Sequence, residues 1–206
     1  MKTKIFLIII TCIVIFQLYY NKQVIYYILN NKKNIPTPEY IIRIIIKNLK
    51  NKITLHNNFI FYDIGCGDGN MINKVFEPNM FKKYIGIEYD YETHQNSKSI
   101  NEMIELVLAN ALTYNYLNIP SVIYLYEPFF SFNYNDAKKM YHKLFKLITT
   151  KCMKTIYIVY LTGDLFLGSP HLYKSKLLNK YKLISKENIY RPLLLRFNKL
   201  FVYKIN

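Results

Sequence analysis

The chain has 206 residues, of which 51% are hydrophobic and 20% are charged, so it can bury a core and is not a disordered protein. Its length suits one domain with a short appendage. The three cysteines lie far apart, which excludes a disulfide framework and indicates a reducing compartment. The four histidines lack the spacing of metal ligands, so we expect no metal site.

The formal net charge of +15 is compatible with a polyanionic partner such as nucleic acid. The lysines are spread along the chain, however, and are not gathered into one basic arm. Lys, Asn, Ile, Tyr and Phe, the residues that AT-rich coding sequence favours, dominate the chain. This composition accounts for the charge by itself, so nucleic-acid binding is the secondary interpretation.

An uncharged run of sixteen residues, IFLIIITCIVIFQLYY, extends from Ile5 to Tyr20 between flanking lysines. A membrane-spanning helix needs about 20 apolar residues, and lysine and tyrosine at its ends can extend a shorter one to the interface. No small residues of a signal-peptide cleavage site follow. A buried amphipathic helix is the alternative, but the run has no polar face. We expect residues 1–30 to form a single-pass membrane anchor and residues 31–206 to form the domain.

The domain is predicted to begin with a helix. In Thr37-Pro38-Glu39, Thr is a favoured N-cap, Pro suits the first turn, and an acid favours the positive end of the helix dipole. The isoleucine-rich run that follows predicts a helix from Tyr40 to about Leu49 with one broad apolar face.

A glycine-rich turn follows the first predicted strand. The apolar run NFIFYDI covers residues 58–64, the sequence GCGDG covers residues 65–69, and a helix is predicted from Asn70 to about Phe76. A strand, a glycine turn and a helix place backbone N–H groups beside a ligand, and glycine lets the backbone approach it closely. The spacing D-x-G-x-G-x-G is neither that of the dinucleotide loop nor that of the P-loop.

A second predicted strand, Lys82 to Tyr89, carries Glu88 near its end. In a doubly wound sheet, an acid at this point faces the ribose hydroxyls of a nucleoside bound over the first loop. Further short apolar runs predict the remaining strands and one more helix. The strands are expected at 104–112, 121–126, 154–161, 182–188 and 199–205, the last two antiparallel, and the helix at 171–181. The predicted fold class is α/β, with a doubly wound, mostly parallel seven-stranded sheet.

The sequences FYDIGCGDGN and YIGIEYD resemble the first two motifs of class I S-adenosylmethionine-dependent methyltransferases. The preceding PTPEYIIRIIIKNL is similar to the lead-in helix of small membrane-anchored protein-lysine methyltransferases of that superfamily. The resemblance covers roughly residues 36–206, is most specific at 61–69, and implies S-adenosylmethionine as the cofactor. It implies a cofactor site composed of Asp63, Ile64, Gly65, Cys66, Gly67, Asp68, Glu88, Tyr89, Asn110 and Ala111.

Within that site, the resemblance places Asp63, Gly65 and Gly67 at the methionine end of the cofactor and Asp68 near its amino group. Two residues depart from the family pattern. Asn110 stands where the family has Asp before Ala, although an amide can still hydrogen-bond an adenine edge. Asn70 stands where close relatives often have Arg.

The sequence Glu127-Pro128-Phe129 follows the fourth predicted strand. It resembles the Asn, Asp or Ser that precedes Pro and an aromatic residue in amino-methyltransferases. A carboxylate there can hold the hydrogens of an acceptor amine while an aromatic face packs beside the methyl group. We predict Glu127, with Tyr126 and Phe129, as the catalytic, acceptor-binding residues. The alternative is a strand that ends at proline beside a core phenylalanine pair.

Together these features predict a monomeric methyltransferase that N-methylates an amine, a lysine of a protein at or near a membrane. Two other functions stay open. One is an RNA or DNA amino-methyltransferase, which the net charge suggests. The other is a membrane-tethered module that binds the cofactor without catalysis, for which the substitutions Asn70 and Asn110 leave room.

Overall fold

The computed structural model describes residues 11, 37–53, 57–129, 132–162, 172, 175–191 and 196–205. Apart from Thr11, the predicted membrane anchor at residues 1–30 therefore lies outside the described residues. Among the helices that are described, none combines the length and the apolar character needed to cross a membrane. The anchor stays a prediction from sequence.

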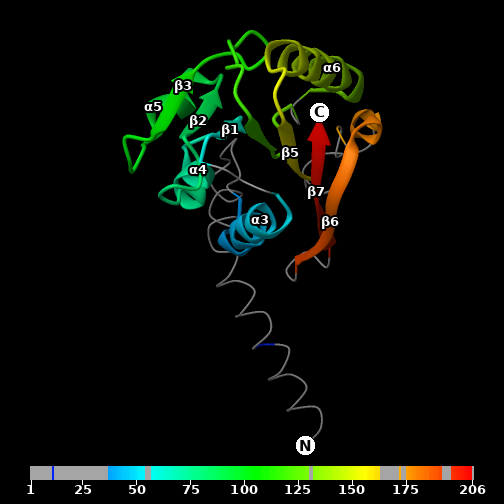
Figure 1. Ribbon diagram of the computed structural model, residues 1–206, viewed down its shortest axis with the longest axis horizontal. Helices are drawn as coiled ribbons and strands as arrows, with labels where there is room; N and C mark the ends of the chain where they lie inside the picture. Colours follow the sequence, from blue (N-terminus) through cyan, green and yellow to red (C-terminus); the bar gives the residue numbers. More distant parts are fainter. Residues whose placement is uncertain are drawn as a thin grey trace, which may run out of the picture.

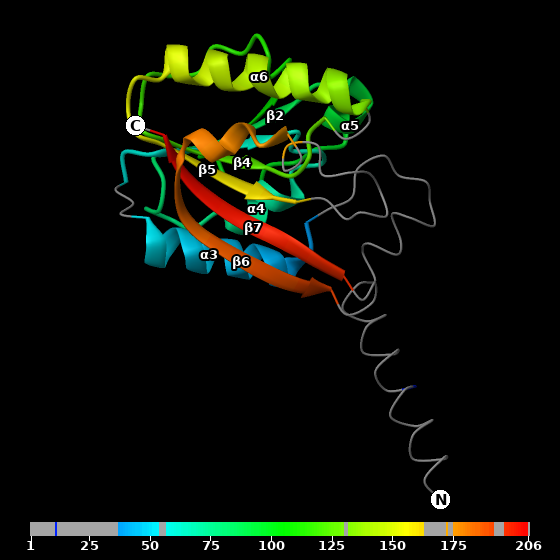
Figure 2. The same cartoon turned by 90° about the vertical axis from the view of Figure 1, so that its right-hand side faces the viewer.

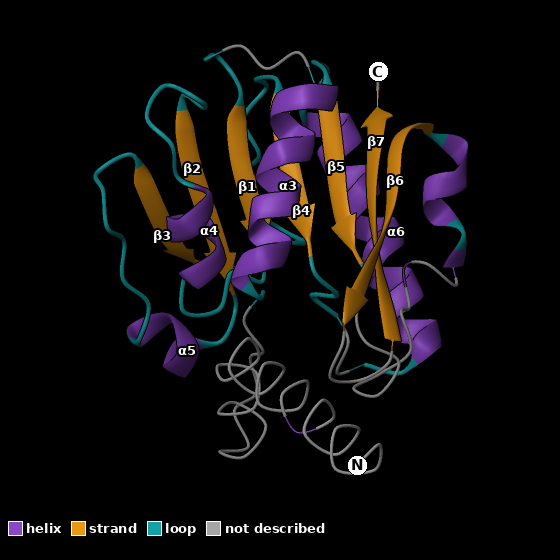
Figure 3. Ribbon diagram, turned by 90° about the horizontal axis from the view of Figure 1, so that it is seen from below, coloured by secondary structure: helices purple, strands orange, loops and turns teal. Residues whose placement is uncertain are grey.

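In the described part of the chain, seven strands form one mixed sheet in the order β3-β2-β1-β4-β5-β7-β6. All neighbouring pairs among β1 to β5 are parallel, whereas β7 pairs antiparallel with both β5 and β6 (Figure 3). The strands are β1 (Ile60–Ile64), β2 (Lys83–Glu88), β3 (Ile104–Leu108), β4 (Ser121–Leu125), β5 (Ile156–Leu161), β6 (Lys182–Arg191) and β7 (Arg196–Ile205). The predicted doubly wound, mostly parallel sheet is confirmed.

Strands β1, β4 and β5 are buried along their whole length. Parallel strands that are covered on both faces are apolar throughout, which is why short apolar runs predicted them. Three strands differ from their predicted bounds by three or four residues: β3 ends at Leu108 and not at Leu112, β6 extends to Arg191, and β7 begins at Arg196. After Leu108 the chain turns. There, the side-chain oxygen of Asn110 accepts a hydrogen bond from the Leu112 N–H at 2.9 Å and turns the chain out of the sheet.

Helices cover both faces of the sheet (Figures 1 and 2). Helices α3 (Glu39–Lys52) and α4 (Asn70–Val75) lie on one face, and α6 (Tyr134–Lys151) lies on the other. The sequence prediction does not include α6, although its buried residues recur at helical spacing. It also lacks the short helix α5 (Tyr91–Gln95). The helix predicted at 171–181 lies partly outside the described residues, and its described part contains the 3-10 helix η1 (Leu177–Lys180).

The start of α3 corrects one prediction. Thr37 is not the N-cap, because Pro38 occupies that position with an extended ψ of 144° and no side chain caps the helix. The Pro38 carbonyl accepts hydrogen bonds from the N–H groups of Ile41 and Ile42. The Thr37 hydroxyl lies 2.9 Å from the hydroxyl of Tyr124 on β4 and joins the helix start to the sheet.

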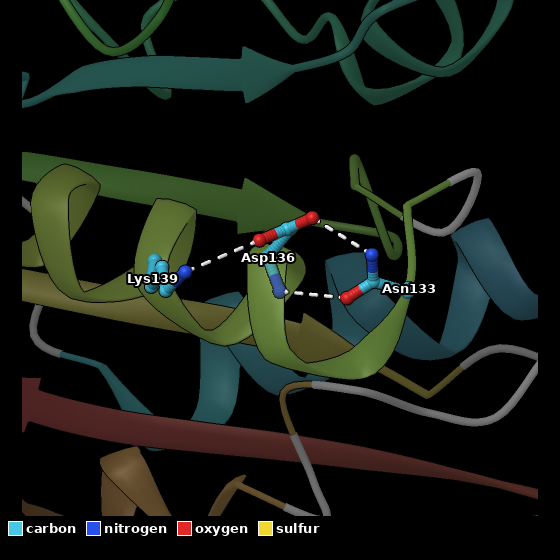
Figure 4. A network of polar contacts seen from close by, with 3 residues as sticks. All are labelled: Asn133, Asp136 and Lys139. Atoms are coloured by element: carbon cyan, nitrogen blue, oxygen red, sulfur yellow. Dashed lines mark hydrogen bonds and ion pairs between the residues drawn. The ribbon is translucent and has the colours of Figure 1, made fainter.

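Helix α6 begins at a capped turn (Figure 4). The Asn133 side chain accepts a hydrogen bond from the Asp136 N–H at 3.0 Å and donates one to the Asp136 carboxylate at 2.7 Å. Lys139 also contacts this carboxylate, at 3.4 Å. The Asn133 hydrogen bond and then Lys139 lower the pKa of Asp136, so the acid is ionised at the positive end of the helix. The cap fixes the end of α6 that lies nearest to the turn after β4.

The sheet divides the core into two clusters, and both contain tyrosines. Tyr62, Tyr141 and Tyr160 belong to the cluster on the α6 face, and Tyr84 and Tyr124 belong to the cluster on the α3 face. These tyrosines are among the largest fully buried side chains. Because a buried tyrosine hydroxyl needs a hydrogen-bonding partner, such a core also places hydroxyl groups in the interior.

Candidate active site

The predicted site residues gather at the carboxyl ends of β1, β2 and β4. Strand β1 lies between β2 and β4, so the chain leaves β1 toward one side of the sheet and later returns on the other side. Ligands of doubly wound sheets bind outside the strand ends at such a switch point. The glycine turn at residues 65–69 and the sequence Glu127-Pro128-Phe129, which are far apart in the sequence, are therefore adjacent in space.

The glycine turn after β1 depends on left-handed backbone conformations. Gly65, Gly67 and Gly69 have φ angles of +74°, +59° and +80°. The Gly65 N–H donates to the Ile87 carbonyl at 2.8 Å, which anchors the turn to β2. A Cβ atom added to Gly65 would lie 3.2 Å from the Pro128 Cβ. The glycine turn and the turn after β4 are thus in close contact.

One glycine of the site was not predicted. Gly86, in the middle of β2, lies beneath the glycine turn, and a Cβ atom there would be 2.8 Å from both the Cys66 Sγ and the Leu106 Cδ2. A lone glycine inside an apolar strand is the sequence signal for such a close approach. Cys66 itself is buried, and burial raises the pKa of its thiol. It packs the turn onto the sheet and is not a reactive thiolate.

Three acids meet at this turn. Asp63 is only 2% exposed, and its Oδ2 has no hydrogen-bonding partner among the described residues. Burial, and then the carboxylates of Glu88 and Asp68, raise the pKa of Asp63 from 3.8 to about 8. Such a centre favours a cationic ligand and disfavours phosphate. No cluster of His, Cys, Asp and Glu among the described residues is arranged to hold a metal ion.

Glu88 ties the ends of β1 and β2 together. Its Oε1 accepts hydrogen bonds from the N–H groups of Tyr89 and Asp90, both at 2.8 Å, and its Oε2 accepts one from the Gly67 N–H at 2.9 Å. A carboxylate has about four acceptor positions, so these three bonds leave one on Oε2 for a ligand. Glu88 therefore shapes the glycine turn as well as offering an acceptor.

The remaining predicted cofactor residues differ in exposure. Tyr89 is 76% exposed, directly after β2. Asn110 is exposed after β3, and Ala111 beside it is buried, with its carbonyl accepting a hydrogen bond from the Tyr116 hydroxyl at 3.0 Å. Asp68 accepts a hydrogen bond from the Asn70 N–H at 3.0 Å at the start of α4. The predicted residues therefore lie along the ends of the three neighbouring strands β1, β2 and β3.

Glu127, after β4, is buried in a strained backbone conformation. It is 4% exposed, and its φ is +45°, which is uncommon for a residue with a side chain. Its Oε2 accepts a hydrogen bond from the Tyr141 hydroxyl at 3.2 Å, and its Oε1 accepts one from the Tyr160 hydroxyl. The sequence prediction did not include either tyrosine. Each lies among apolar residues, Tyr141 on the buried face of α6 and Tyr160 in β5, and so looks like an ordinary core residue in the sequence.

The two predicted aromatic partners of Glu127 lie on different faces of the sheet. Phe129 is buried in the cluster on the α6 face, where its ring meets the edge of Tyr141 at a centroid distance of 4.9 Å. Tyr126 is half-buried and packs against the cluster on the α3 face. Phe129 has the environment of the core phenylalanine that the sequence left open as an alternative.

Neither a protein-family model nor a curated protein sequence matches the chain. Solved structures resemble it. The N-methyltransferase NodS from Bradyrhizobium japonicum WM9, in complex with S-adenosyl-L-homocysteine, aligns with a TM-score of 0.60 and 10% identity over 82% of this chain and 88% of that chain. The magnesium protoporphyrin IX methyltransferase from Synechocystis PCC 6803 aligns with a TM-score of 0.55 and 8% identity over 94% of this chain and 99% of that chain.

A putative class I S-adenosylmethionine-dependent methyltransferase from Listeria monocytogenes aligns with a TM-score of 0.57 and 14% identity, over 82% of this chain and 60% of that chain. The chain has the class I methyltransferase fold. At this low identity the likeness establishes the fold alone, so the chemistry depends on the residues of the site.

Proposed function

We propose that the chain is an S-adenosylmethionine-dependent methyltransferase that acts on an amine. The observation that carries this proposal is the buried Asp63 carboxyl group, whose Oδ2 has no partner in the described part of the chain, beside Glu88 and Asp68. The cofactor carries an ammonium and a sulfonium group, and both are attracted to this centre of three acids. The phosphates of a nucleotide would be repelled by it.

The residues present fit this cofactor. Gly65 and Gly67 would let its methionine end lie against the backbone, Asp63 would hold its ammonium group, and the remaining acceptor position of Glu88 would take a ribose hydroxyl. The Asn110 amide has donors and an acceptor for an adenine edge. All of these residues lie at or just after the carboxyl ends of β1, β2 and β3.

When bound, the cofactor would supply a methyl group on a sulfonium: the lone pair of an amine would form a bond to the methyl carbon in line as the carbon–sulfur bond breaks, and S-adenosylhomocysteine would leave. The chain must therefore orient the amine and exclude water from it. Glu127 would do so in this proposal, and the support is that its turn touches the glycine turn through Pro128. Tyr126 and Phe129, which lie on different faces of the sheet, stay predictions from sequence for the acceptor side.

Calorimetry with S-adenosylhomocysteine and the full-length chain tests the cofactor site. We expect binding by the wild type and affinity at least about tenfold weaker, or about 1.4 kcal/mol, in Asp63→Ala and Glu88→Ala. The matched control is Glu105→Ala, because Glu105 is an exposed acid of β3 that pairs with Lys83. A folded wild-type chain that does not bind the ligand would refute the proposal.

The acceptor that we propose is a lysine of a protein at or near a membrane. The support is the apolar run at residues 5–20 and the presence of an N-methyltransferase among the structural neighbours. Incubating membrane and cytosolic extracts with tritiated S-adenosylmethionine should label a membrane protein. Deleting residues 1–30 should abolish this labelling and leave the affinity for S-adenosylhomocysteine intact. Equal labelling without these residues would contradict the membrane part of the proposal.

The net charge of +15 favours a second candidate, an RNA or DNA amino-methyltransferase. Binding to nucleic acid that weakens as the salt concentration rises would support it, and no binding at low salt would exclude it. Cofactor binding without labelling of any extract would instead indicate a module that binds the cofactor without catalysis.

A further inference from the structure

The Glu127 carboxylate is held from two separate elements. Tyr141 on α6 donates to its Oε2 at 3.2 Å, and Tyr160 on β5 donates to its Oε1. All three side chains are buried. A buried carboxylate is stable only where hydrogen-bond donors replace the water that it has lost, and these two hydroxyls supply such donors.

The two hydroxyls are preorganised by ring packing. The Tyr160 ring stacks on Phe201 of β7, at a centroid distance of 6.1 Å and an interplanar angle of 14°. The Tyr141 ring meets Phe129 at 4.9 Å. Burial, and then the Glu127 carboxylate, raise the pKa of Tyr141 well above its ordinary value, so this hydroxyl remains a donor at all working pH values.

The backbone at Glu127 explains why such an anchor is needed. A φ of +45° costs energy for a residue with a Cβ, and it persists only when the surroundings hold it in place. The next residue, Pro128, faces Gly65, where even one added Cβ would lie within 3.2 Å. A small movement of the Glu127 turn therefore changes the space next to the glycine turn.

We propose that Tyr160 and Tyr141 are positioning residues for methyl transfer. They hold Glu127 so that the turn after β4 forms the acceptor wall of the site at a fixed distance from the cofactor loop. This inference rests on the proposed function, and it adds that the wall is built for a cationic or hydrogen-bond-donating nitrogen at the point of transfer. Neither tyrosine needs to touch the cofactor or the acceptor.

The test compares two ligands of the full-length chain by calorimetry. S-adenosylhomocysteine has no group at the position of the transferred methyl, whereas the analogue sinefungin carries an amine there. We expect Tyr160→Phe and Tyr141→Phe to weaken sinefungin binding by about tenfold each, because a Glu127 carboxylate that has lost one of these hydrogen bonds is no longer held toward the sinefungin amine. Their affinity for S-adenosylhomocysteine should stay within about twofold of the wild type, because Asp63 and Glu88 are unchanged.

Tyr62→Phe is the matched control, because it removes a buried tyrosine hydroxyl of the same core cluster that contacts the Leu117 N–H instead, at 3.3 Å. It should change neither affinity. In a Glu127→Gln background, Tyr160→Phe should have less effect on sinefungin than in the wild type, because the hydroxyl acts through the carboxylate. Glu127→Gln alone provides the same comparison of ligands if a tyrosine variant does not fold.

The inference is overturned if both tyrosine variants bind the two ligands as the wild type does, or if they weaken both ligands equally. Equal weakening would show a general structural role. If the wild-type chain binds neither ligand, the proposed function itself fails, and this result is distinguishable from the first two.

Discussion

Replacing Asp63 by Asn should stabilise the fold by an amount that depends on pH. Burial, Glu88 and Asp68 raise the pKa of Asp63 from 3.8 to about 8 in the folded chain. Below pH 4 both the folded and the unfolded chain carry the proton, and the group has no effect on the pH dependence. Between pH 4 and pH 8 the unfolded chain releases the proton while the folded chain keeps it, so the stability of the wild type falls as the pH rises.

The expected size follows from the constant of 1.36 kcal/mol for each pH unit. At pH 7 the free energy of unfolding of the wild type is about 4 kcal/mol lower than at pH 4, because pH 7 lies about 3 units above the ordinary pKa of 3.8. Asn cannot ionise, so Asp63→Asn should be more stable than the wild type by about this amount at pH 7 and similar to it at pH 4. The same substitution should weaken S-adenosylhomocysteine binding, which would show that the site retains a destabilising acid for its function.

Urea unfolding followed by circular dichroism at pH 4, 5.5, 7 and 8.5 measures the effect. Glu105→Gln is the matched control, because it exchanges an exposed acid of β3 for its amide and leaves the buried centre unchanged. A difference between Asp63→Asn and the wild type that does not grow from pH 4 to pH 7 would refute the reasoning.

Four further substitutions test the geometry of the glycine turn and of the α6 cap. Gly65→Ala should lose measurable binding of S-adenosylhomocysteine and destabilise the fold by about 1–2 kcal/mol, because its φ is +74°; unchanged calorimetry would contradict this. Gly86→Ala should destabilise the fold, and Cys66→Ala should partly restore the urea midpoint by removing the Sγ that lies 2.8 Å from the new Cβ position. Asn133→Ala should cost about 1 kcal/mol of urea stability through the lost cap of α6, and no loss would show that the cap is replaced.

Much of the fold could be predicted from the sequence because its signals are local. Strands such as IFYDI and IYIVYL are buried on both faces and therefore read as short apolar runs. The glycine turn was also recognisable, because Gly65 and Gly67 adopt left-handed backbone angles that other residues avoid. The N-cap assigned to Thr37 was wrong, because a hydroxyl that can cap a helix can equally reach a distant Tyr124, and only the folded structure selects between them.

The proposed acceptor side of the site was less predictable, since it depends on contacts between distant segments. Nothing in the sequence around Tyr141 or Tyr160 distinguishes these tyrosines from ordinary core residues, and their meeting at Glu127 requires α6 and β5 to be in place. The hydrogen bond from the Gly67 N–H to Glu88 similarly forms only when β1 and β2 pair. Side-chain chemistry at these positions is therefore a property of the assembled sheet.

The order of the strands also constrains how the chain is made. Strand β7 follows β6 in the sequence but lies between β5 and β6, so β6 can join the sheet only after β7 has been synthesised. Until then the edge of β5 that β7 covers is open, and Tyr160 lacks the Phe201 ring on which it stacks. A nascent chain that has emerged only as far as β6 contains the residues of the glycine turn but lacks Phe201, on which Tyr160 stacks. If the proposed function holds, the cofactor side of the site would therefore be complete in sequence before the acceptor side is.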